Sequence, residues 1–491
     1  MARGRYTPVD SPPRVSNPQL FYRRLTLVAA VLAGACGGGS STAPTTAASA
    51  TPTPAPRPNI VLVLADDLDV DSAQLLPRLP VVMGQPGLTF SRAYVTTALC
   101  APSRASILTG QYAHNHRLIY SEPPDGGFPS FHGDASTIAV WLKAGGYRTA
   151  LLGKYLNGYP HEAAETYVPP GWDEWFGHLS DFEDGRYYNY WINDNGSISR
   201  YGSQPDEYST DVLTRRAVDY IQKAAGRAEP FFLYLAPEAP HAPAIPPDRH
   251  SGEFPREGCL RSPSFNEADV RDKPAWVQGI PLMTDADIKR ADSFERGRLR
   301  TTRAVEDMMD QVLAALVAAG KLDNTYVFFA SDNGLLMGEH RAVGRKNNHY
   351  EESIRVPLMV RGPGVPAGQV IAHPVLNIDL APTFAELARI SIPDSVDGRS
   401  FAPLLRASPP GLDQWRSDFL LEHFAEGVSS ALRTADVLYA ELESGELEFY
   451  DMRKDPYQVD SLHRKVDRSV LEPFSRRLAA LANCRGAGCR N

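Results

Sequence analysis

The sequence is poor in positive charge and in cysteine. Its 50 lysines and arginines are outnumbered by 58 aspartates and glutamates, which gives a net charge of −8. Such a chain has no overall basic field to attract nucleic acid, so we expect no nucleic-acid partner and expect a few local cations to meet any bound anion. There are only five cysteines in 491 residues, and no cysteine–histidine cluster of the zinc-binding kind is apparent. Zinc enzymes that need several histidine ligands are therefore disfavoured.

Long apolar runs are also scarce. The run at residues 25–35 follows Arg23 and Arg24 and is too short to span a bilayer, but it has the length of the apolar region of a signal peptide. The stretch Ala33-Gly34-Ala35-Cys36 resembles the lipobox of bacterial lipoproteins, in which the cysteine carries the lipid. We therefore expect residues 1–35 to be a signal peptide. The protein would be exported, either to the outer face of the cell membrane by a lipid on Cys36 or as a plain secreted protein.

A segment without apolar periodicity follows. Residues 36–58 are rich in serine, threonine, alanine and proline, cannot bury enough apolar surface to order themselves, and are expected to form a flexible tether. The folded part should begin near Asn59. Beyond it, short apolar runs alternate with helical patterns, which predicts an α/β fold with a parallel sheet between helices.

Four of these apolar runs end directly in polar residues. Because ligands of open α/β sheets gather at the carboxyl ends of the strands, we expect the polar residues to converge there. The runs are NIVLVLADD, ending in Asp66 and Asp67; YRTALLGKY, with Lys154; PFFLYLAPEAPH, ending in His241; and NTYVFFASDNG, with Asp332 and Asn333.

A lone cysteine stands in the stretch ALCAPSRASILTG, residues 98–110. Pro102 is suited to the first turn of a helix and Gly110 to its end, so we expect Cys100 just before a helix N-terminus, where free N–H groups favour negative charge. Taken singly, a buried cysteine is usually inert packing, and an aspartate pair after a strand is often a turn.

Taken together, these residues indicate a hard cation and an anionic substrate. Carboxylate and amide oxygens are the ligands that Ca²⁺ or Mg²⁺ prefers. The cations Arg104, Lys154 and Lys346 would meet an anion held beside that ion.

At this point the chain resembles the type I, formylglycine-dependent sulfatases. Cys100-Ala101-Pro102-Ser103-Arg104 followed by Leu108-Thr109-Gly110 looks like their signature, in which the cysteine is oxidised to formylglycine after synthesis. The resemblance covers nearly all of residues 59–491. It implies an alkaline-phosphatase-like sheet sandwiched by helices, a formylglycine-generating enzyme as maturation partner, and a sulfated carbohydrate or other sulfate ester as substrate.

The resemblance also implies a role for each residue. Arg104 would support the hydrated formylglycine, while Lys154, His241 and Lys346 would hold the sulfate and assist the leaving oxygen. A hydrated aldehyde has two hydroxyls on one carbon, so one can attack sulfur and the other can later collapse to the aldehyde and expel sulfate. The implied ligands of a divalent metal, usually Ca²⁺ with Mg²⁺ also compatible, are Asp66, Asp67, Asp332, Asn333 and the modified residue 100.

One position departs from the family pattern. Many sulfatases have a histidine two residues after the lysine that corresponds to Lys154. This chain has Leu156 at that position. The nearby alternatives for that role, and for contacts to the substrate, are Asn157, His114 and His116.

The segment that contains this departure, GKYLNGY, is similar to that of the N-acetylglucosamine-6-sulfatases within the family. So are TGQYAHNH, the YYNY segment, IRVPLMVRGPG and the terminal CRGAGCR. This implies the 6-sulfate of N-acetylglucosamine units as substrate, with residues 187–196 and the neighbourhood of His114 and His116 against the sugar. The tyrosines of that segment can alternatively be packing residues.

The last part of the chain looks like the small C-terminal domain of the family. We expect a catalytic domain over residues 59–405 and a smaller α+β domain over 406–491, with an antiparallel hairpin around ESGE. Cys484 and Cys489 are close enough in sequence to form a disulfide in an exported protein, whereas nothing pairs Cys259.

Three other functions remain open from the sequence. The first is an arylsulfatase of unassigned substrate. The second is a phosphatase or phosphonate monoester hydrolase of the same superfamily. The third is a lipid-anchored binding or structural protein whose site has decayed.

Overall fold

The computed structural model describes residues 56–180, 185–424 and 428–490, so the predicted signal peptide and the lipidation site Cys36 lie outside the described residues. Residues from Ala55 onward form one compact unit. No helix in the described ranges has the length and apolarity to cross a membrane.

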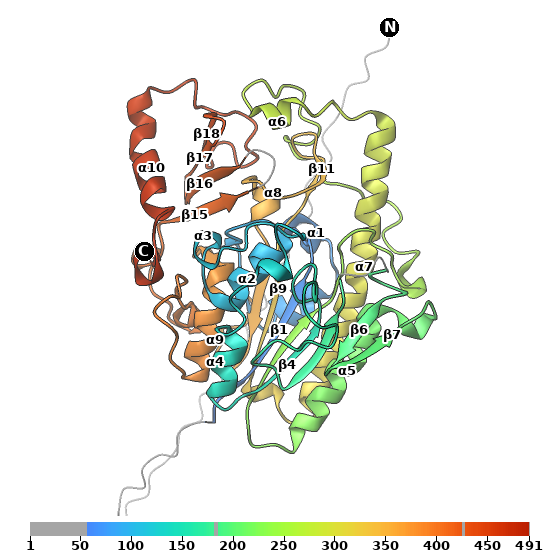
Figure 1. Cartoon of the computed structure of the whole chain (residues 1–491). Coiled ribbons are helices and arrows are strands. Elements are labelled where there is room, and N and C mark those ends of the chain that lie inside the picture. The colour runs from blue at the N-terminus through green and yellow to red at the C-terminus, as the bar shows by residue number, and fades with distance from the viewer. Residues whose placement is uncertain (1–55, 181–184, 425–427, 491) are drawn as a thin grey trace, which may run out of the picture. The chain divides into compact units, whose positions relative to one another are not determined.

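A ten-stranded mixed sheet forms the centre of the molecule (Figure 1). All four predicted strands are present and are neighbours: β9, β1, β8 and β4 run parallel, side by side. Every residue of β1 is buried, which explains why its sequence is a continuous apolar run instead of an alternating one. The strands, in sheet order, are β13 (Gln369–Ile371), β2 (Leu88–Phe90), β12 (Leu358–Arg361), β9 (Thr325–Ser331), β1 (Asn59–Ala65), β8 (Phe231–Ala236), β4 (Arg148–Gly153), β5 (Glu174–His178), β6 (Trp191–Asp194) and β7 (Ser197–Arg200).

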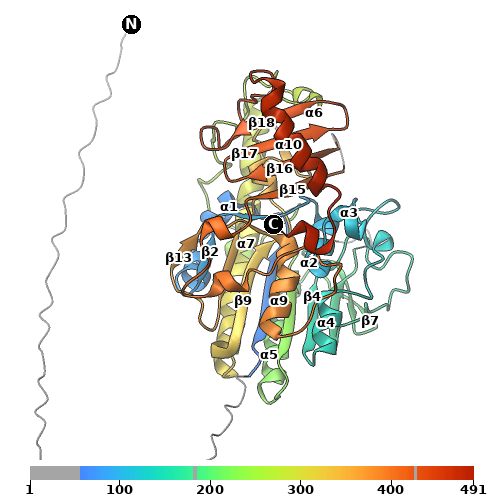
Figure 2. The same ribbon diagram turned by 90° about the vertical axis from the view of Figure 1, so that its left-hand side faces the viewer.

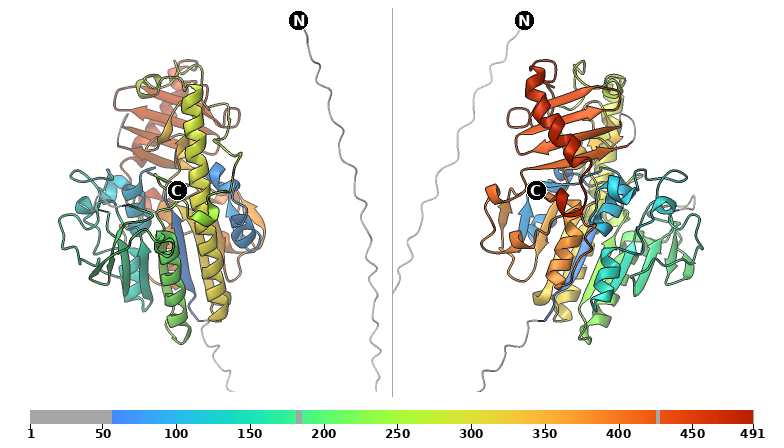
Figure 3. Two further views of the ribbon diagram at one scale, coloured as in Figure 1. Left: turned by 90° about the vertical axis from the view of Figure 1, so that its right-hand side faces the viewer. Right: turned by 60° about the vertical axis from the view of Figure 1, so that its left-hand side comes forward.

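Helices cover both faces of this sheet. α5 (Ser209–Ala225) and α7 (Asp285–Ala318) lie on one face, as the left view of Figure 3 shows. α2 (Cys100–Thr109), α4 (Ile138–Ala144) and α9 (Leu380–Ala388) lie on the other, which faces the viewer in Figure 2. Alternate residues of β1 accordingly enter two different apolar cores, Ile60 and Leu62 on the α2 side and Val61 and Val63 on the α7 side.

The chain ends in a second, antiparallel sheet of four strands, as predicted for the C-terminal part. It consists of β15 (Asp418–His423), β16 (Ser429–Thr434), β17 (Val437–Leu442) and β18 (Leu447–Asp451), and α10 (Arg468–Leu481) packs against it. The predicted hairpin around ESGE is the β17–β18 pair. Figure 2 shows this sheet beyond the carboxyl edge of the large one, and a backbone bond from Glu422 N to Thr96 O, 2.8 Å, joins it to the segment before α2.

The remaining elements are short. They are α1 (Val70–Gln74), α3 (Ala113–His116), α6 (Ala275–Gln278) and α8 (Glu351–Ile354), the pair β10 (Leu336–Met337) and β11 (Val343–Arg345), and the pair β3 (Ala93–Tyr94) and β14 (Val375–Leu376). The predicted disulfide between Cys484 and Cys489 is present, and Cys259 is a free, buried thiol.

Candidate functional site

Helix α2 presents Cys100 at the carboxyl edge of the large sheet. The helix begins at Cys100 itself, one residue earlier than expected, because Leu99 takes the extended conformation of the capping position. Gly110 ends the helix in the left-handed conformation, with φ of 68°, as its place in the sequence predicted. The Cys100 side chain is buried, with 2% exposed.

The polar ends of β1 and β9 converge on this cysteine. The Cys100 thiol donates to Asp66 Oδ1 at 3.4 Å and lies 3.8 Å from Asp67 Oδ1. Asp332 belongs to the same group, since one ligand atom from each of Asp66, Asp67, Cys100 and Asp332 lies within 4.8 Å of the others. Burial and the charge of Asp66 raise the pKa of the Cys100 thiol.

Arg104, one helical turn after Cys100, connects three segments of the site. Its Nε donates to Asp332 Oδ2 at 2.8 Å and its Nη1 to the Lys154 carbonyl at 3.0 Å. Its Nη2 lies 3.6 Å from Asp66 Oδ2. Because Arg104 is fully buried, these carboxylates are the charge that compensates it.

Two lysines and a histidine complete the cluster that the sequence predicted. Lys154, fully buried, contacts the Asp66 carboxylate. Lys346 contacts the Asp67 carboxylate and donates to Cys100 Sγ at 2.7 Å. His241 Nε2 lies 3.7 Å from Asp67 Oδ2. Since the side chains of His241 and Lys346 are 18% and 16% exposed, the site opens on their side.

The electrostatic environment differs between the carboxylates. Burial alone would raise the pKa of Asp66, but Lys154, His241 and Arg104 together hold it well below its usual value. Burial and the charge of Asp66 instead raise the pKa of Asp332. Asp332 is therefore less stabilised as an anion than Asp66, mainly because it is buried.

The residues fit a hard divalent cation. Asn333 donates through Nδ2 to Asp67 Oδ1 at 2.5 Å, while its amide oxygen is buried and accepts no hydrogen bond from a described group. An unsatisfied buried oxygen beside three carboxylates is the donor set that Ca²⁺ or Mg²⁺ takes. The predicted ligands thus lie together and can hold such an ion.

Two other residues predicted to contact the substrate, His114 and His116, have their ring nitrogens bonded within the protein. His114 uses Nδ1 on Glu422 and Nε2 on the Cys484 carbonyl, at 2.8 and 2.9 Å. His116 bonds Ser106 Oγ at 3.0 Å and accepts from Leu118 N at 3.1 Å, and burial and His114 lower its pKa to about 3. Neither ring has a nitrogen left for a sugar.

Leu156, at the position of the departure, is buried in the core. Its neighbour Asn157 donates through Nδ2 to Glu122 Oε1 at 2.7 Å, while its buried amide oxygen accepts no hydrogen bond from a described group. In the YYNY segment, Tyr187 and Tyr190 are also buried, and Tyr190 stacks on Tyr201 with ring centres 5.1 Å apart. These two tyrosines are packing residues, which was the alternative interpretation of the segment.

Sequence reasoning missed Arg298, which holds the backbone of the site. Its Nη2 donates to the Asp67 carbonyl and to Asp69 Oδ2, each at 2.6 Å, from within α7. The available signal was position: Arg298 lies seven residues before Val305 and so on the same, apolar face of the helix. An arginine on such a face needs buried acceptors.

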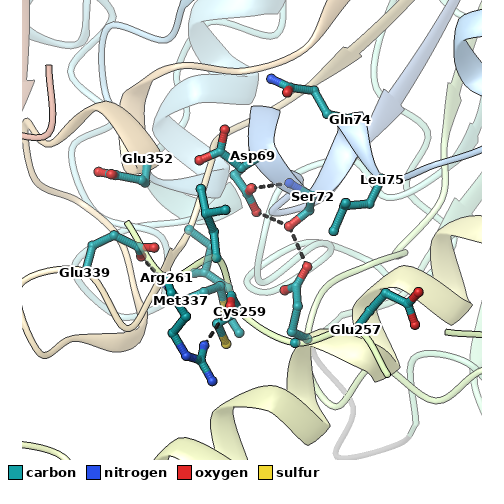
Figure 4. Close-up of a pocket in the computed structure, with 15 residues that line it drawn as sticks. Asp69, Ser72, Gln74, Leu75, Glu257, Cys259, Arg261, Met337, Glu339 and Glu352 are labelled. Carbon is teal, nitrogen blue, oxygen red and sulfur yellow. Dashed lines mark hydrogen bonds between the residues drawn. The ribbon is translucent and has the colours of Figure 1, made fainter. Parts of the chain in front are cut away.

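A cavity of about 340 Å³ lies beside Asp69 (Figure 4). It is lined by carboxylates, including Asp71, Glu339 and Glu352, and by the free thiol Cys259. Among the described residues these carboxylates form no group close enough to hold a metal ion. The predicted metal ligands are therefore those around Cys100.

Two family descriptions match overlapping parts of the chain. Residues 58–390 match the family described as Sulfatase, and residues 338–483 match a region described as N-sulphoglucosamine sulphohydrolase, C-terminal. An N-acetylglucosamine-6-sulfatase of Capra hircus is 33% identical over 479 residues, which cover 88% of this chain and 84% of the relative.

Solved structures share the fold. One, in complex with its substrate D-glucosamine-2-N,6-O-disulfate, has a TM-score of 0.72 at 22% identity and covers 87% of this chain and 97% of its own. A phosphonate monoester hydrolase of Agrobacterium radiobacter has a TM-score of 0.67 at 21% identity, with 87% and 95% covered.

Removing one predicted ligand tests the metal site. We expect CaCl₂ or MgCl₂ to stabilise the unmodified chain against thermal unfolding, by about 2.7 kcal/mol when the cation is in hundredfold excess over its Kd. Asp332→Asn should lose this stabilisation, because the charge of one predicted ligand is removed while the size of the side chain is kept. Thermal unfolding and calorimetric titration measure it. Asp310→Asn, at a half-exposed carboxylate paired with Arg78, is the control. Unchanged cation binding by Asp332→Asn would contradict the assignment.

Proposed function

Because the chain belongs to the sulfatase family, whose members hydrolyse sulfuric esters, we propose that it removes the 6-sulfate from N-acetylglucosamine units of sulfated glycans. The observation that supports this substrate is the 33% identity to an N-acetylglucosamine-6-sulfatase over most of both chains. The site fits the chemistry, since buried cations surround the position where a small anion would meet residue 100.

The nucleophile of this proposal is Cys100 after oxidation to formylglycine by a separate generating enzyme. The hydrated aldehyde carries two hydroxyls. One loses its proton and attacks sulfur, forming an O–S bond as the bond from sulfur to the sugar oxygen breaks and that oxygen takes up a proton. The second then loses its proton and becomes the aldehyde oxygen as the carbon–oxygen bond to sulfate breaks, which releases sulfate.

The residues around Cys100 have distinct parts in these steps. Lys154 and Lys346 reach the Asp66 and Asp67 carboxylates on either side of residue 100, so their ammonium groups can hold the sulfate oxygens. His241 donates through Nδ1 to the Ala242 carbonyl at 2.8 Å, because a carbonyl only accepts. Its Nε2 is therefore the nitrogen left to meet the substrate, and it can pass a proton to the leaving sugar oxygen when the ring carries both protons.

Arg104 acts mainly on the geometry of the site. By binding Asp332 and the Lys154 carbonyl it fixes one predicted metal ligand and one sulfate-binding segment relative to the helix of Cys100. A divalent cation, Ca²⁺ in this proposal, held by Asp66, Asp67, Asp332, Asn333 and residue 100, would supply positive charge where negative charge develops.

Replacing Cys100 tests whether the nucleophile is a modified residue and not the thiol itself. Cys100→Ser should keep the fold but lose steady-state kcat on the order of 10³-fold or more, since serine has no second hydroxyl to release sulfate. Cys259→Ser, at the other free buried cysteine, is the matched control and should remain active. Mass spectrometry of the residue-100 peptide should show the lower mass of the aldehyde. Steady turnover by Cys100→Ser would contradict the mechanism.

The substrate is tested with two sugars that differ in the configuration at C4 and in the substituent at C2. We expect N-acetylglucosamine 6-sulfate to exceed galactose 6-sulfate in kcat/KM by about 10²-fold, because the missing acetamido group and the mismatched hydroxyl leave polar groups unpaired at a cost of about 2–3 kcal/mol. 4-Nitrophenyl sulfate and phenyl phosphonate are assayed beside them. Hydrolysis of the aryl sulfate alone would indicate an arylsulfatase of another substrate, and preference for the phosphonate would indicate a phosphonate hydrolase.

We also propose that the protein is exported and anchored by a lipid on Cys36. Support comes from the signal-like segment and the lipobox-like stretch of the sequence. Cys36→Ala is expected to move the protein from the membrane fraction to the soluble extracellular or periplasmic fraction. Continued membrane association of Cys36→Ala, measured by fractionation, would overturn the lipid anchor.

A further inference from the structure

The segment at Arg186 and Tyr187 lies directly against the loop that carries His241. Tyr187 Oη donates to the His241 carbonyl at 2.5 Å. The same loop accepts a hydrogen bond from the Asp66 amide at the Ala239 carbonyl, 3.1 Å. The Arg186 segment is thus separated from the end of β1 by a single loop.

Glu238, in that loop, holds the Arg186 side chain. Its carboxylate is 2% exposed, and Oε2 accepts from Arg186 Nη1 at 2.8 Å. Its Oε1 is buried, accepts no hydrogen bond from a described group and lies 3.6 Å from His178 Nδ1. Burial would raise the pKa of Glu238, but Lys154, Arg186 and His178 lower it to about 2. Glu238 is therefore a fixed anion between Lys154 inside the site and Arg186 at its edge.

Arg186 differs from the other cations of the site in exposure. Its side chain is 31% exposed, compared with 1% for Lys154 and 0% for Arg104. The bond to Glu238 uses one of the five N–H donors of a guanidinium, whose planar fork suits a carboxylate or a sulfate. The Arg186 guanidinium contacts Glu238, in the loop that also carries His241.

We propose that Arg186 binds a second anionic group of the substrate, a sulfate or carboxylate on the sugar side of the ester being cleaved, and that Glu238 positions it. The inference rests on the proposed function for the identity of the sugar. It adds a specificity-determining contact: the enzyme would favour glycans that carry another negative charge next to the 6-sulfate.

Two sugars that differ by one charge test the contact. The probes are N-acetylglucosamine 6-sulfate and glucosamine carrying sulfate at both nitrogen and O6. Arg186→Met should raise KM for the disulfated sugar about 10- to 100-fold, the loss of one charged hydrogen bond, with kcat changed less than about 3-fold. For the monosulfated sugar, kcat and KM should stay within about 3-fold of the parent. Loss on both sugars alike, or on neither, overturns the proposal.

Two further variants separate recognition from structure. Glu238→Gln should show the same selective rise in KM, and Arg186→Lys should recover part of the affinity because the charge returns without the fork. Arg249→Met, at another partly exposed arginine that donates to Asp211 at 2.7 and 2.8 Å, should leave both sugars unaffected. A lowered melting temperature with equal loss on both sugars would mark Arg186 as structural.

Two aryl sulfates allow the Arg186 contact to be tested without a sugar substrate. If the parent enzyme cleaves 4-nitrophenyl sulfate but neither sugar, the proposed substrate fails. Arg186→Met is then compared on aryl sulfates with and without a ring carboxylate. Selective loss on the carboxylated ester supports the contact, and equal kinetics on both esters overturns it.

Discussion

The structure depends on keeping three carboxylates buried side by side at one edge of a sheet. Asp66, Asp67 and Asp332 are each at most 4% exposed, and removing an isolated charge from water costs several kcal/mol unless opposite charge and hydrogen bonds compensate it. Compensation here comes from elements far apart in sequence. Arg104 is supplied by α2 and Lys154 by the end of β4, while Lys346 comes from the loop after β11. The charges therefore also fix the relative positions of these elements.

The small C-terminal sheet extends this arrangement outward. Glu448 on β18 is fully buried and binds His349 and Tyr350, the latter at 3.0 Å from its hydroxyl. Those residues follow Lys346 within a few positions, and Asn347 N donates to the Ala98 carbonyl at 2.7 Å. The small sheet thus holds the lysine loop against the segment that leads into Cys100. The small sheet therefore supports the lysine loop of the site.

Sequence reasoning succeeded where a pattern was strong and local. The four buried strands are unbroken apolar runs, the helix from Cys100 to Thr109 has proline early and glycine at its end, and the polar residues follow from the geometry of parallel strands. It could not show that the ring nitrogens of His114 and His116 are bonded within the fold, because nearness to a site in sequence does not reveal the hydrogen-bond partners of a side chain. Arg298 and Arg186 were missed because their partners lie far away in the chain and only the tertiary structure brings them together.

Asp67 shows what it takes to point two consecutive side chains at one predicted metal site. In an extended strand neighbouring side chains face opposite sides, so Asp66 and Asp67 could not both reach Cys100. Asp67 takes a left-handed backbone with φ of 66°, a conformation that costs about 1–3 kcal/mol outside glycine and is best tolerated by aspartate and asparagine. Its amide donates to Asp332 Oδ1 and its carbonyl accepts from Arg298, so the bonds that orient the ligands also hold the turn. The second aspartate is thus constrained twice, by its charge and by its backbone. A glutamate would keep the charge but fit this turn poorly, and a glycine would fit the turn but leave the cation short of a ligand.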